Sequence, residues 1–147
     1  MDIQTRMLRN SDYDKITDLL AELGYPMTLE DVTMQYEELQ KHPDYETIVA
    51  VKNDSIVGIA GLCKSYYFER KGTYARILTF VVSEAERQQG IGTKLLQTCE
   101  QWAIEQGCNS IALNSGNRKE RQAAHAFYIA NGYVGRSTGF SKSIGDM

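Results

Sequence analysis

VSEAERQQGIGTKLL, residues 82–96, is the stretch of sequence that decides the fold of this chain. An apolar, strand-like run ends at Val82, a short polar loop follows, and a glycine-rich turn opens an amphipathic helix. The first turn of a helix leaves backbone N–H groups unpaired at the positive end of the helix dipole. Gly90 and Gly92 let a ligand approach that backbone closely. The stretch therefore predicts a site for a phosphate or pyrophosphate group.

Spacing separates the families that build such a site. A dinucleotide fingerprint GxGxxG requires glycine at position 95, which is Leu95, and a P-loop requires GK before Ser or Thr, whereas Gly92 is followed by Thr93. Both of those motifs also follow the first strand of a parallel unit, and here about 80 residues precede the turn. The pattern that remains is RxxGxG, formed by Arg87, Gly90 and Gly92.

Hydrophobic periodicity divides the rest of the chain into strands and helices. The expected order is β-α-α-β-β-β-α-β-α-β-β, which places the chain in the α/β class (mixed α+β). Because strands and helices do not alternate strictly, we expect a mixed sheet with helices on both faces rather than a doubly wound Rossmann domain. The expected strands are about 3–9, 46–52, 55–67, 74–82, 109–114, 133–136 and 139–144, and the expected helices are about 12–23, 28–39, 90–106 and 118–130.

Local signals mark several boundaries of these elements. Ser11 is expected to cap the first helix, and Thr28 followed by Asp31 resembles a capping box for the second. Asn53-Asp54 predicts a tight hairpin turn. Continuous apolar character from Ile77 to Val82 predicts a strand covered on both faces.

Composition limits the class of protein. The 147 residues are expected to form a single domain, 1–147, and 19 acidic against 16 basic residues give a net charge of −3, which does not favour nucleic acid as a partner. The three cysteines and two histidines show no metal-ligand spacing, so no metal is expected. No signal-peptide-like or membrane-spanning apolar run is seen, so we expect a cytoplasmic protein that does not bind membranes.

A second motif completes the pattern. The sequence AHAFYxxxGY spans residues 124–133 and includes Phe127, Tyr128, Gly132 and Tyr133. Together with RxxGxG, the strand before it and the helix after it, this motif resembles the GNAT superfamily of N-acetyltransferases. The resemblance covers essentially the whole chain. It implies the GNAT fold, with a mostly antiparallel central sheet.

The resemblance also implies a donor, acetyl-coenzyme A, and a site for it. Family members bind this molecule where two parallel strands splay apart at a β-bulge, here about 74–82 and 109–114. The resemblance places the main chain of Phe80, Val81 and Val82 against the pantetheine and the acetyl carbonyl. The remaining expected donor contacts are the backbone of Gln88, Gln89, Gly90, Ile91, Gly92 and Thr93, with help from the side chains of Arg87 and Thr93.

Tyr128 matches the tyrosine that many family members use as a general acid toward the departing thiolate. One position departs from the family pattern: many members carry asparagine seven residues before this tyrosine, and here that residue is Arg121. Arg121 is therefore either a contact for coenzyme A phosphates or a solvated side chain. His125 is either part of the cleft or a structural residue. The run Arg76–Thr79 contains no carboxylate that could serve as the general base.

These expectations define an enzyme and two alternatives. The expected reaction moves acetyl from acetyl-coenzyme A to a primary amine of a small molecule or peptide, by direct attack in a ternary complex. The first alternative is an acyl-coenzyme A-binding regulatory module without turnover, and the second is a nucleotide-binding protein that uses the same glycine-rich turn. A homodimer is a further expectation, by analogy with relatives. The acceptor is expected near residues 25–27, Tyr66, Tyr67 and residues 136–140.

Overall fold

A computed structural model of the chain describes residues 2–22, 24–87, 89–114, 122–136 and 139–145. The chain divides into two compact units, residues 1–113 and 114–147, which are described separately below.

The first unit contains a five-stranded sheet in the order β1-β2-β3-β4-β5. Neighbouring strands are antiparallel except β4 and β5, which are parallel. This mixed, mostly antiparallel sheet confirms the expected fold class. The elements are β1 (Ile3–Met7), η1 (Asn10–Asp12), α1 (Tyr13–Glu22), α2 (Leu29–Gln40), β2 (Tyr45–Lys52), β3 (Ser55–Tyr66), β4 (Thr73–Val82), η2 (Glu84–Glu86), α3 (Ile91–Glu105) and β5 (Ile111–Leu113).

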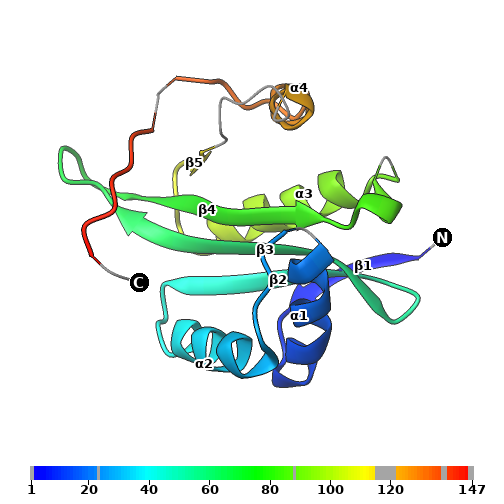
Figure 1. Ribbon diagram of the computed structural model, residues 1–147. Coiled ribbons are helices and arrows are strands. Elements are labelled where there is room, and N and C mark those ends of the chain that lie inside the picture. Colours follow the sequence, from blue (N-terminus) through cyan, green and yellow to red (C-terminus); the bar gives the residue numbers. More distant parts are fainter. Residues whose placement is uncertain (1, 23, 88, 115–121, 137–138, 146–147) are drawn as a thin grey trace. The chain divides into compact units, whose positions relative to one another are not determined.

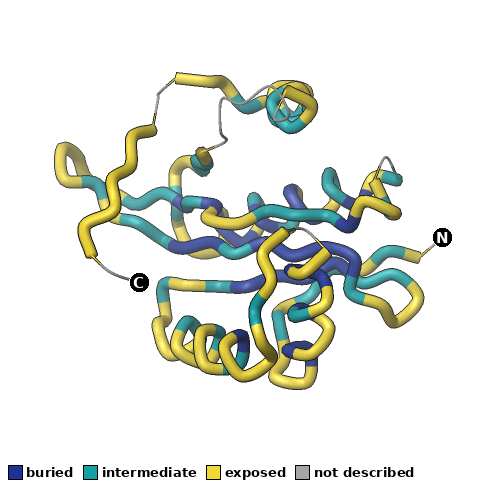
Figure 2. The backbone as a smooth tube through the Cα atoms, in the orientation of Figure 1, coloured by how far each residue is buried: buried dark blue, intermediate teal, exposed yellow. Residues whose placement is uncertain are grey.

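Helices cover both faces of this sheet, as Figure 1 shows, with α1 and α2 on one face and α3 on the other. Alternation along the strands supplies apolar side chains to both layers. Val49 and Ile59 pack in one cluster with α1 and α2. A Cβ at Gly58 would lie 3.4 Å from Leu95 of α3 and 3.5 Å from Ala50, so these residues share the opposite face. Buried residues accordingly gather where the helices meet the central strands (Figure 2).

Two of the expected boundary signals are confirmed. The Thr28 hydroxyl accepts the Asp31 N–H at 3.0 Å and caps α2. Asn53 and Asp54, between β2 and β3, both have positive φ, 50° and 66°. Positive φ at both central residues is the requirement of a type I′ hairpin turn, which Asn and Asp tolerate.

The expectation that Ser11 caps the first helix is wrong. Ser11 lies inside η1, and the residue that organises this turn is Asp12, only 2% exposed. Its carboxylate accepts the Arg9 N–H at 2.8 Å and two hydrogen bonds from the Arg6 guanidinium, at 2.7 and 3.0 Å. A bidentate, charge-assisted pair holds this turn more strongly than a neutral serine cap would.

A β-bulge interrupts β4 at Leu78. Leu62 pairs with Ile77 and Gly61 pairs with Thr79, which leaves Leu78 as the extra residue on β4. Leu78 is 52% exposed, so the expectation that Ile77–Val82 is covered on both faces is wrong at this position. The physical reason is the bulge, which takes Leu78 out of the regular in-and-out alternation.

The parallel pairing of β4 with β5 ends beside that bulge. Ala75, Arg76 and Ile77 pair with Ile111, Ala112 and Leu113, and β4 then continues to Val82. The parallel strands and the bulge that the family resemblance implied are therefore both present. The expected strand 109–114 is shorter than predicted.

The second unit contains one described helix, α4 (Gln122–Ala130); the expected start at residue 118 lies outside the described residues. The expected strands 133–136 and 139–144 are wrong, because the described residues there form no strand. Alternating side chains favour a strand only when one face is buried, and Val134, Phe140 and Ile144 are 68%, 93% and 94% exposed.

The Asp12 ion pair leads to a stability prediction. Arg6 holds the pKa of Asp12 below its ordinary value, so the contribution of this carboxylate is fully present above about pH 4 and is lost as the pH falls through its folded-state pKa. Asp12→Asn should therefore lower the free energy of unfolding by about 2 kcal/mol at pH 7. The difference from the original chain should shrink below pH 4.

Urea unfolding followed by fluorescence of Trp102, which is 5% exposed, measures both effects. Asp18→Asn, at an exposed position of α1, is the matched control and should change the free energy of unfolding by less than about 0.5 kcal/mol. Equal effects of the two substitutions at pH 7 would contradict the role given to Asp12.

Candidate donor and acceptor sites

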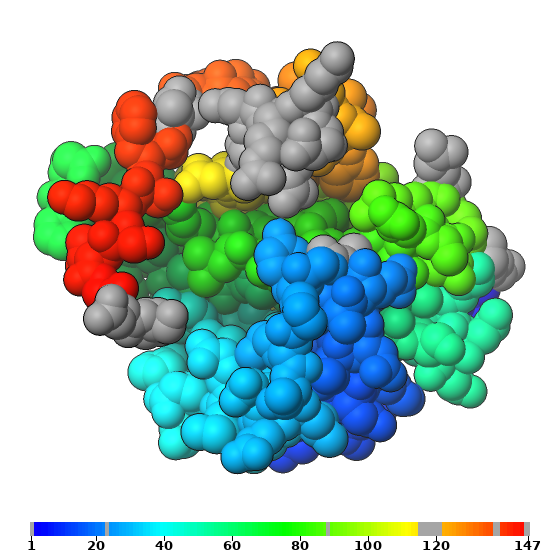
Figure 3. Space-filling view, in the orientation of Figure 1, coloured from blue at the N-terminus to red at the C-terminus, as the bar shows by residue number. Residues whose placement is uncertain are grey.

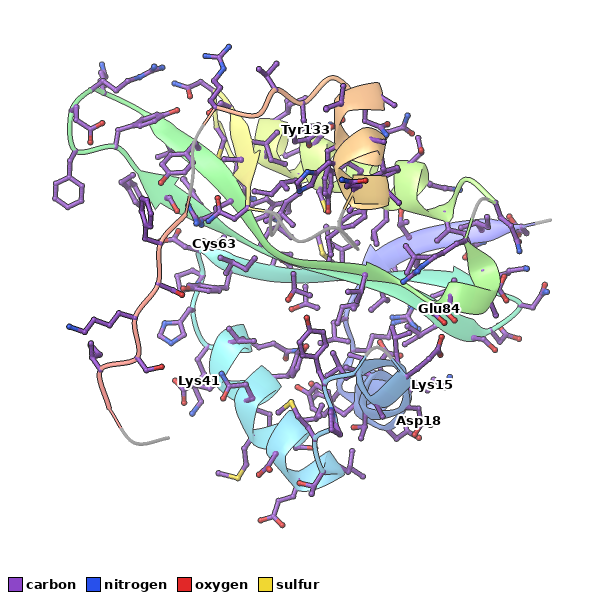
Figure 4. The ribbon with its side chains drawn as sticks, turned by 45° about the horizontal axis from the view of Figure 1, so that its top comes forward. Lys15, Asp18, Lys41, Cys63, Glu84 and Tyr133 are labelled. Carbon is purple, nitrogen blue, oxygen red and sulfur yellow. The ribbon has the colours of Figure 1, made fainter. Side chains whose placement is uncertain are left out.

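The loop from β4 to α3 is fastened to α1 and to β3. Ser83 is buried; its N–H donates to the Val57 carbonyl at 2.8 Å and its hydroxyl donates to Glu22 Oε1 at 2.7 Å. The Glu84 N–H donates to the same Glu22 oxygen at 3.2 Å. Figure 4 shows Glu84 beside α1, whose Lys15 and Asp18 are labelled. The chain therefore leaves β4 in a fixed direction.

Gly90 makes the turn into α3. It is the N-cap residue and has φ 81° and ψ 3°, the left-handed region that side chains other than Asn and Asp rarely adopt. A Cβ placed there would meet no atom within 4 Å. Gly90 is therefore required by its backbone conformation, and the space beside it is open.

The first turn of α3 presents backbone donors. The first hydrogen bond inside the helix runs from the Lys94 N–H to the Gly90 carbonyl at 3.1 Å. The N–H groups of Ile91, Gly92 and Thr93 precede it and have no carbonyl partner within the helix. The Ile91 side chain is 1% exposed and fixes this end of α3 against the sheet. This geometry is the one expected of a phosphate site.

Arg87 is directed toward its own loop. Its Nε donates to the Val82 carbonyl at 3.3 Å, and its guanidinium lies 3.8 Å from Glu84. The side chain is 55% exposed, so these contacts are weak and a bound anion could replace them. Gln88, another expected donor contact, lies outside the described residues.

The residues expected to face the thioester continue β4 beyond the bulge. Phe80, Val81 and Val82 pair with Ala60, Ile59 and Gly58 of β3. Val81 also packs against the cluster formed by α1, α2 and the sheet. Residues 80–82 are therefore held by the packing of Val81 and by backbone pairing with β3 along one edge, so their backbone conformation is that of a sheet strand.

A cavity of about 520 Å³ lies on the α2 face of the sheet. Thr47, Gly61 and Thr79 are direct partners on three adjacent strands and line it, with the exposed Leu78 of the bulge beside them. Figure 3 shows this side of the molecule, with α2 in light blue and cyan and β4 in green. The remaining lining residues are Met7, Leu8, Tyr36, Leu39, Gln40, His42, Pro43, Tyr45, Glu46, Ile59 and Leu62.

The sequence did not reveal this cavity. None of the residues expected to hold an acceptor lines it. Tyr67, for example, follows β3, and its hydroxyl donates at 2.8 Å to Asn109, which lies between α3 and β5. The cavity forms where Gly61, which has no side chain, lies between Thr47 and Thr79 on the neighbouring strands. These three residues are distant in the sequence and meet only through strand pairing. Burial raises the pKa of Tyr36, so its phenol stays protonated at neutral pH.

In the second unit, the Tyr128 motif forms the end of α4. The Tyr133 N–H donates to the Tyr128 carbonyl at 3.0 Å and the Gly132 N–H donates to the Ile129 carbonyl at 3.0 Å. With Gly132 at φ 91°, this is a Schellman motif. The rings of Tyr128 and Tyr133 lie 6.0 Å apart, and those of Phe127 and Tyr128 lie 5.4 Å apart. The spacing YxxxGY therefore fixes the Tyr128 ring between two aromatic neighbours. Arg121 lies outside the described residues, and His125 is half-buried on α4.

Two of the three cysteines, Cys63 and Cys99, are buried, and burial raises the pKa of the Cys99 thiol to about 12. Cys108 is half-buried, and its Sγ accepts a hydrogen bond from the Thr73 hydroxyl at 3.7 Å. Within the described ranges, no group of three His, Cys, Asp or Glu residues is placed to hold a metal ion. No helix in the described part of the chain is long and apolar enough to cross a membrane.

Comparison with known proteins shows which family this chain resembles in sequence and fold. A model of the acetyltransferase (GNAT) family matches residues 13–133. A GNAT family acetyltransferase of Staphylococcus aureus is 34% identical, with a TM-score of 0.85 over 98% of this chain and 100% of that chain. Glucosamine-6-phosphate N-acetyltransferase of Arabidopsis thaliana, 22% identical with a TM-score of 0.82 over 99% and 100% of the two chains, shares the fold.

Among curated proteins, the aminoalkylphosphonate N-acetyltransferase of Salmonella typhimurium is 28% identical over 102 residues. That alignment covers 69% of this chain and 65% of the relative, slightly less than two thirds of its length.

Gly90 supplies a test of the turn. Gly90→Ala should lower the free energy of unfolding by about 1–2 kcal/mol, because alanine is strained at positive φ. Gly90→Asn should cost less than half as much, since asparagine tolerates this conformation. Gly135→Ala is the matched control, because its Cβ also meets nothing within 4 Å and its φ is not positive. Chemical denaturation of the three variants measures their free energies of unfolding. If Gly90→Ala lowers this free energy no more than Gly135→Ala does, the turn tolerates a side chain.

Proposed function

The chain belongs to the GNAT family of acetyltransferases, and from that premise we propose that it transfers an acetyl group from acetyl-coenzyme A to a primary amine of a small molecule or peptide. The observation that carries the proposal is the N-terminus of α3, where Gly90 turns the chain and the N–H groups of Ile91, Gly92 and Thr93 have no partner within the helix. These donors and the helix dipole suit the pyrophosphate of the donor.

In this proposal the donor extends from the α3 turn along the far end of β4. The backbone of residues 88–93, with the side chains of Arg87 and Thr93, holds the pyrophosphate. The backbone of Phe80, Val81 and Val82 meets the pantetheine and the acetyl carbonyl. The position of β4 supports this arrangement, because its pairing with β5 ends at Ile77 and the strand then continues to the turn.

The proposed acceptor site is the cavity beside the bulge. Thr79 lines the cavity and directly precedes Phe80, so an amine bound there would lie next to the segment proposed to hold the thioester. Its wall is made of aromatic, aliphatic and hydroxyl groups, with Glu46 as a carboxylate among the lining residues. The two relatives act on different amines by their names, so we carry over the transfer to an amine and leave the acceptor to experiment.

The proposed chemistry is direct. The amine nitrogen attacks the thioester carbonyl, an N–C bond forms and an oxyanion develops, which backbone N–H groups can stabilise. The C–S bond then breaks, and the thiolate of coenzyme A takes a proton from the phenol of Tyr128. The attacking nitrogen loses a proton to water, and the Tyr128 phenolate regains a proton from water, so that the products are the amide and free coenzyme A. The proposed route uses no protein thiol, and the burial of Cys63 and the raised pKa of the buried Cys99 make these two thiols poor nucleophiles.

The proposal treats residues 1–147 as one catalytic domain. The family match runs from residue 13 to residue 133 and so includes parts of both structural units. We further propose that the enzyme works without a metal and in the cytoplasm, without nucleic-acid or membrane partners. A homodimer stays a prediction.

Release of free coenzyme A in the presence of a panel of primary amines tests the function. We expect amine-dependent release by the original chain. In Tyr128→Phe, kcat should fall about 10–100-fold, which is less than the contribution of many general acids. The KM for acetyl-coenzyme A should change little, because the phenol acts on the leaving group. Tyr133→Phe, a phenol in the same motif, is the control and should keep its kcat. Tight coenzyme A binding without release for any amine would instead favour a regulatory module.

Gly61 tests the acceptor cavity. Its Cβ would meet Thr79 at an ordinary 3.8 Å, and its φ is not positive, so a side chain fits the strand and projects into the hollow. Gly61→Leu should raise the KM for the amine at least about tenfold, the order expected from a filled hydrophobic pocket, while the KM for acetyl-coenzyme A stays within about twofold. Ser65→Leu, on the same strand but outside the cavity lining, should change neither KM. An unchanged amine KM in Gly61→Leu would place the acceptor elsewhere.

A further inference from the structure

Lys52, the last residue of β2, contacts the loop between β4 and α3 from outside the glycine-rich motif. Its ammonium donates to Glu86 Oε2 at 2.6 Å and to Gln89 Oε1 at 2.9 Å. These two partners lie on either side of residues 87 and 88. One side chain therefore contacts the loop at Glu86 and again at Gln89, the residue before Gly90.

The backbone of Lys52 is paired with strands on both sides in the sheet. It pairs with Ile3 of β1 on one side and with Ser55 of β3 on the other, next to the β2–β3 turn. The side chains of Lys52 and Glu86 are only 15% and 23% exposed. A short ion pair that is largely removed from water positions its groups more firmly than a surface pair does.

We propose that Lys52 is a positioning residue for the donor, which sets the β4–α3 loop in the conformation that presents its backbone N–H groups to the pyrophosphate. The inference rests on the proposed function of this loop. It adds a residue that lies about 35 positions before the RxxGxG motif, on a different strand.

Lys52 also neutralises a charge beside the proposed phosphate site. Glu86 precedes Arg87 in the loop, and without Lys52 its carboxylate would repel the phosphates of the donor. Loss of Lys52 thus has two separable effects, which are freedom of the loop and an unpaired negative charge. The second effect disappears when Glu86 is neutral.

The test measures the Kd of coenzyme A by calorimetry, and kcat and KM with an amine accepted by the original chain. Lys52→Met should raise the Kd of coenzyme A, and the KM of acetyl-coenzyme A, by about tenfold, with kcat within about twofold. Lys52→Arg, which keeps the charge and can reach the same oxygens, should restore most of the affinity. The double variant Lys52→Met with Glu86→Gln should bind more tightly than Lys52→Met alone.

Lys15→Met is the matched control. Lys15 is an exposed lysine of α1 whose ammonium lies 3.5 Å from the Asp54 carbonyl, and its removal should leave Kd, KM and kcat unchanged. Chemical denaturation of each variant confirms that it is folded at the assay temperature. If Lys52→Met fails this check, Lys52→Gln and Lys52→Arg carry the comparison.

Two outcomes would overturn the inference: a Kd for coenzyme A within twofold of the original in folded Lys52→Met, or a loss of kcat with no change in KM. Failure of the proposed function gives a different result, which is seen in the original chain: it releases no coenzyme A with any amine, whether or not it binds coenzyme A.

Discussion

The constraint on which the rest of this structure depends is the pairing of β4. This strand is antiparallel to β3 along its length but parallel to β5 at only three residue pairs, and its bulge falls where the second pairing ends. Parallel neighbours require a crossover, and α3 supplies it on one face of the sheet. The end of β4, the turn at Gly90 and the start of α3 follow in consequence. The cavity on the other face opens at the same bulge.

The loop that follows β4 is held by polar contacts more than by apolar burial. Glu22 of α1 accepts from Ser83 and Glu84, and Lys52 of β2 donates to Glu86 and Gln89. Each contact comes from an element fixed by the core, so the loop is positioned from two sides while its backbone stays accessible. An apolar anchor would instead fill the space that a ligand needs. This use of side-chain hydrogen bonds suits a loop proposed to bind an anion, because rigid supports keep its N–H donors in place.

Part of the AHAFYxxxGY motif, residues 124–133, ends helix α4. Gly132 and Tyr133 complete the Schellman turn of α4, and the ring of Tyr133 contacts that of Tyr128. The spacing of the motif thus reflects helix termination, which in turn fixes the tyrosine proposed as general acid. In the other unit Gly90 has a comparable role at the start of a helix. In both places a backbone requirement at one glycine sets the direction of neighbouring chemical groups.

The sequence by itself determined the elements with strong periodic patterns and the turns that need particular residues. The order of strands and helices through α4, the Thr28 cap, the Asn53-Asp54 turn and the glycine at the start of α3 were all predictable, because each depends on residues close together in the chain. Only the tertiary structure decided the exposure of Leu78, the replacement of the Ser11 cap by Asp12, the absence of strands at residues 133–136 and 139–144, the cavity and the Lys52 contacts. These depend on which distant segments become neighbours: Thr47, Gly61 and Thr79 meet only through strand pairing, and Lys52 meets Glu86 only because β2 ends beside the β4–α3 loop. A local pattern contains no information on such partners, and folding into a sheet supplies it.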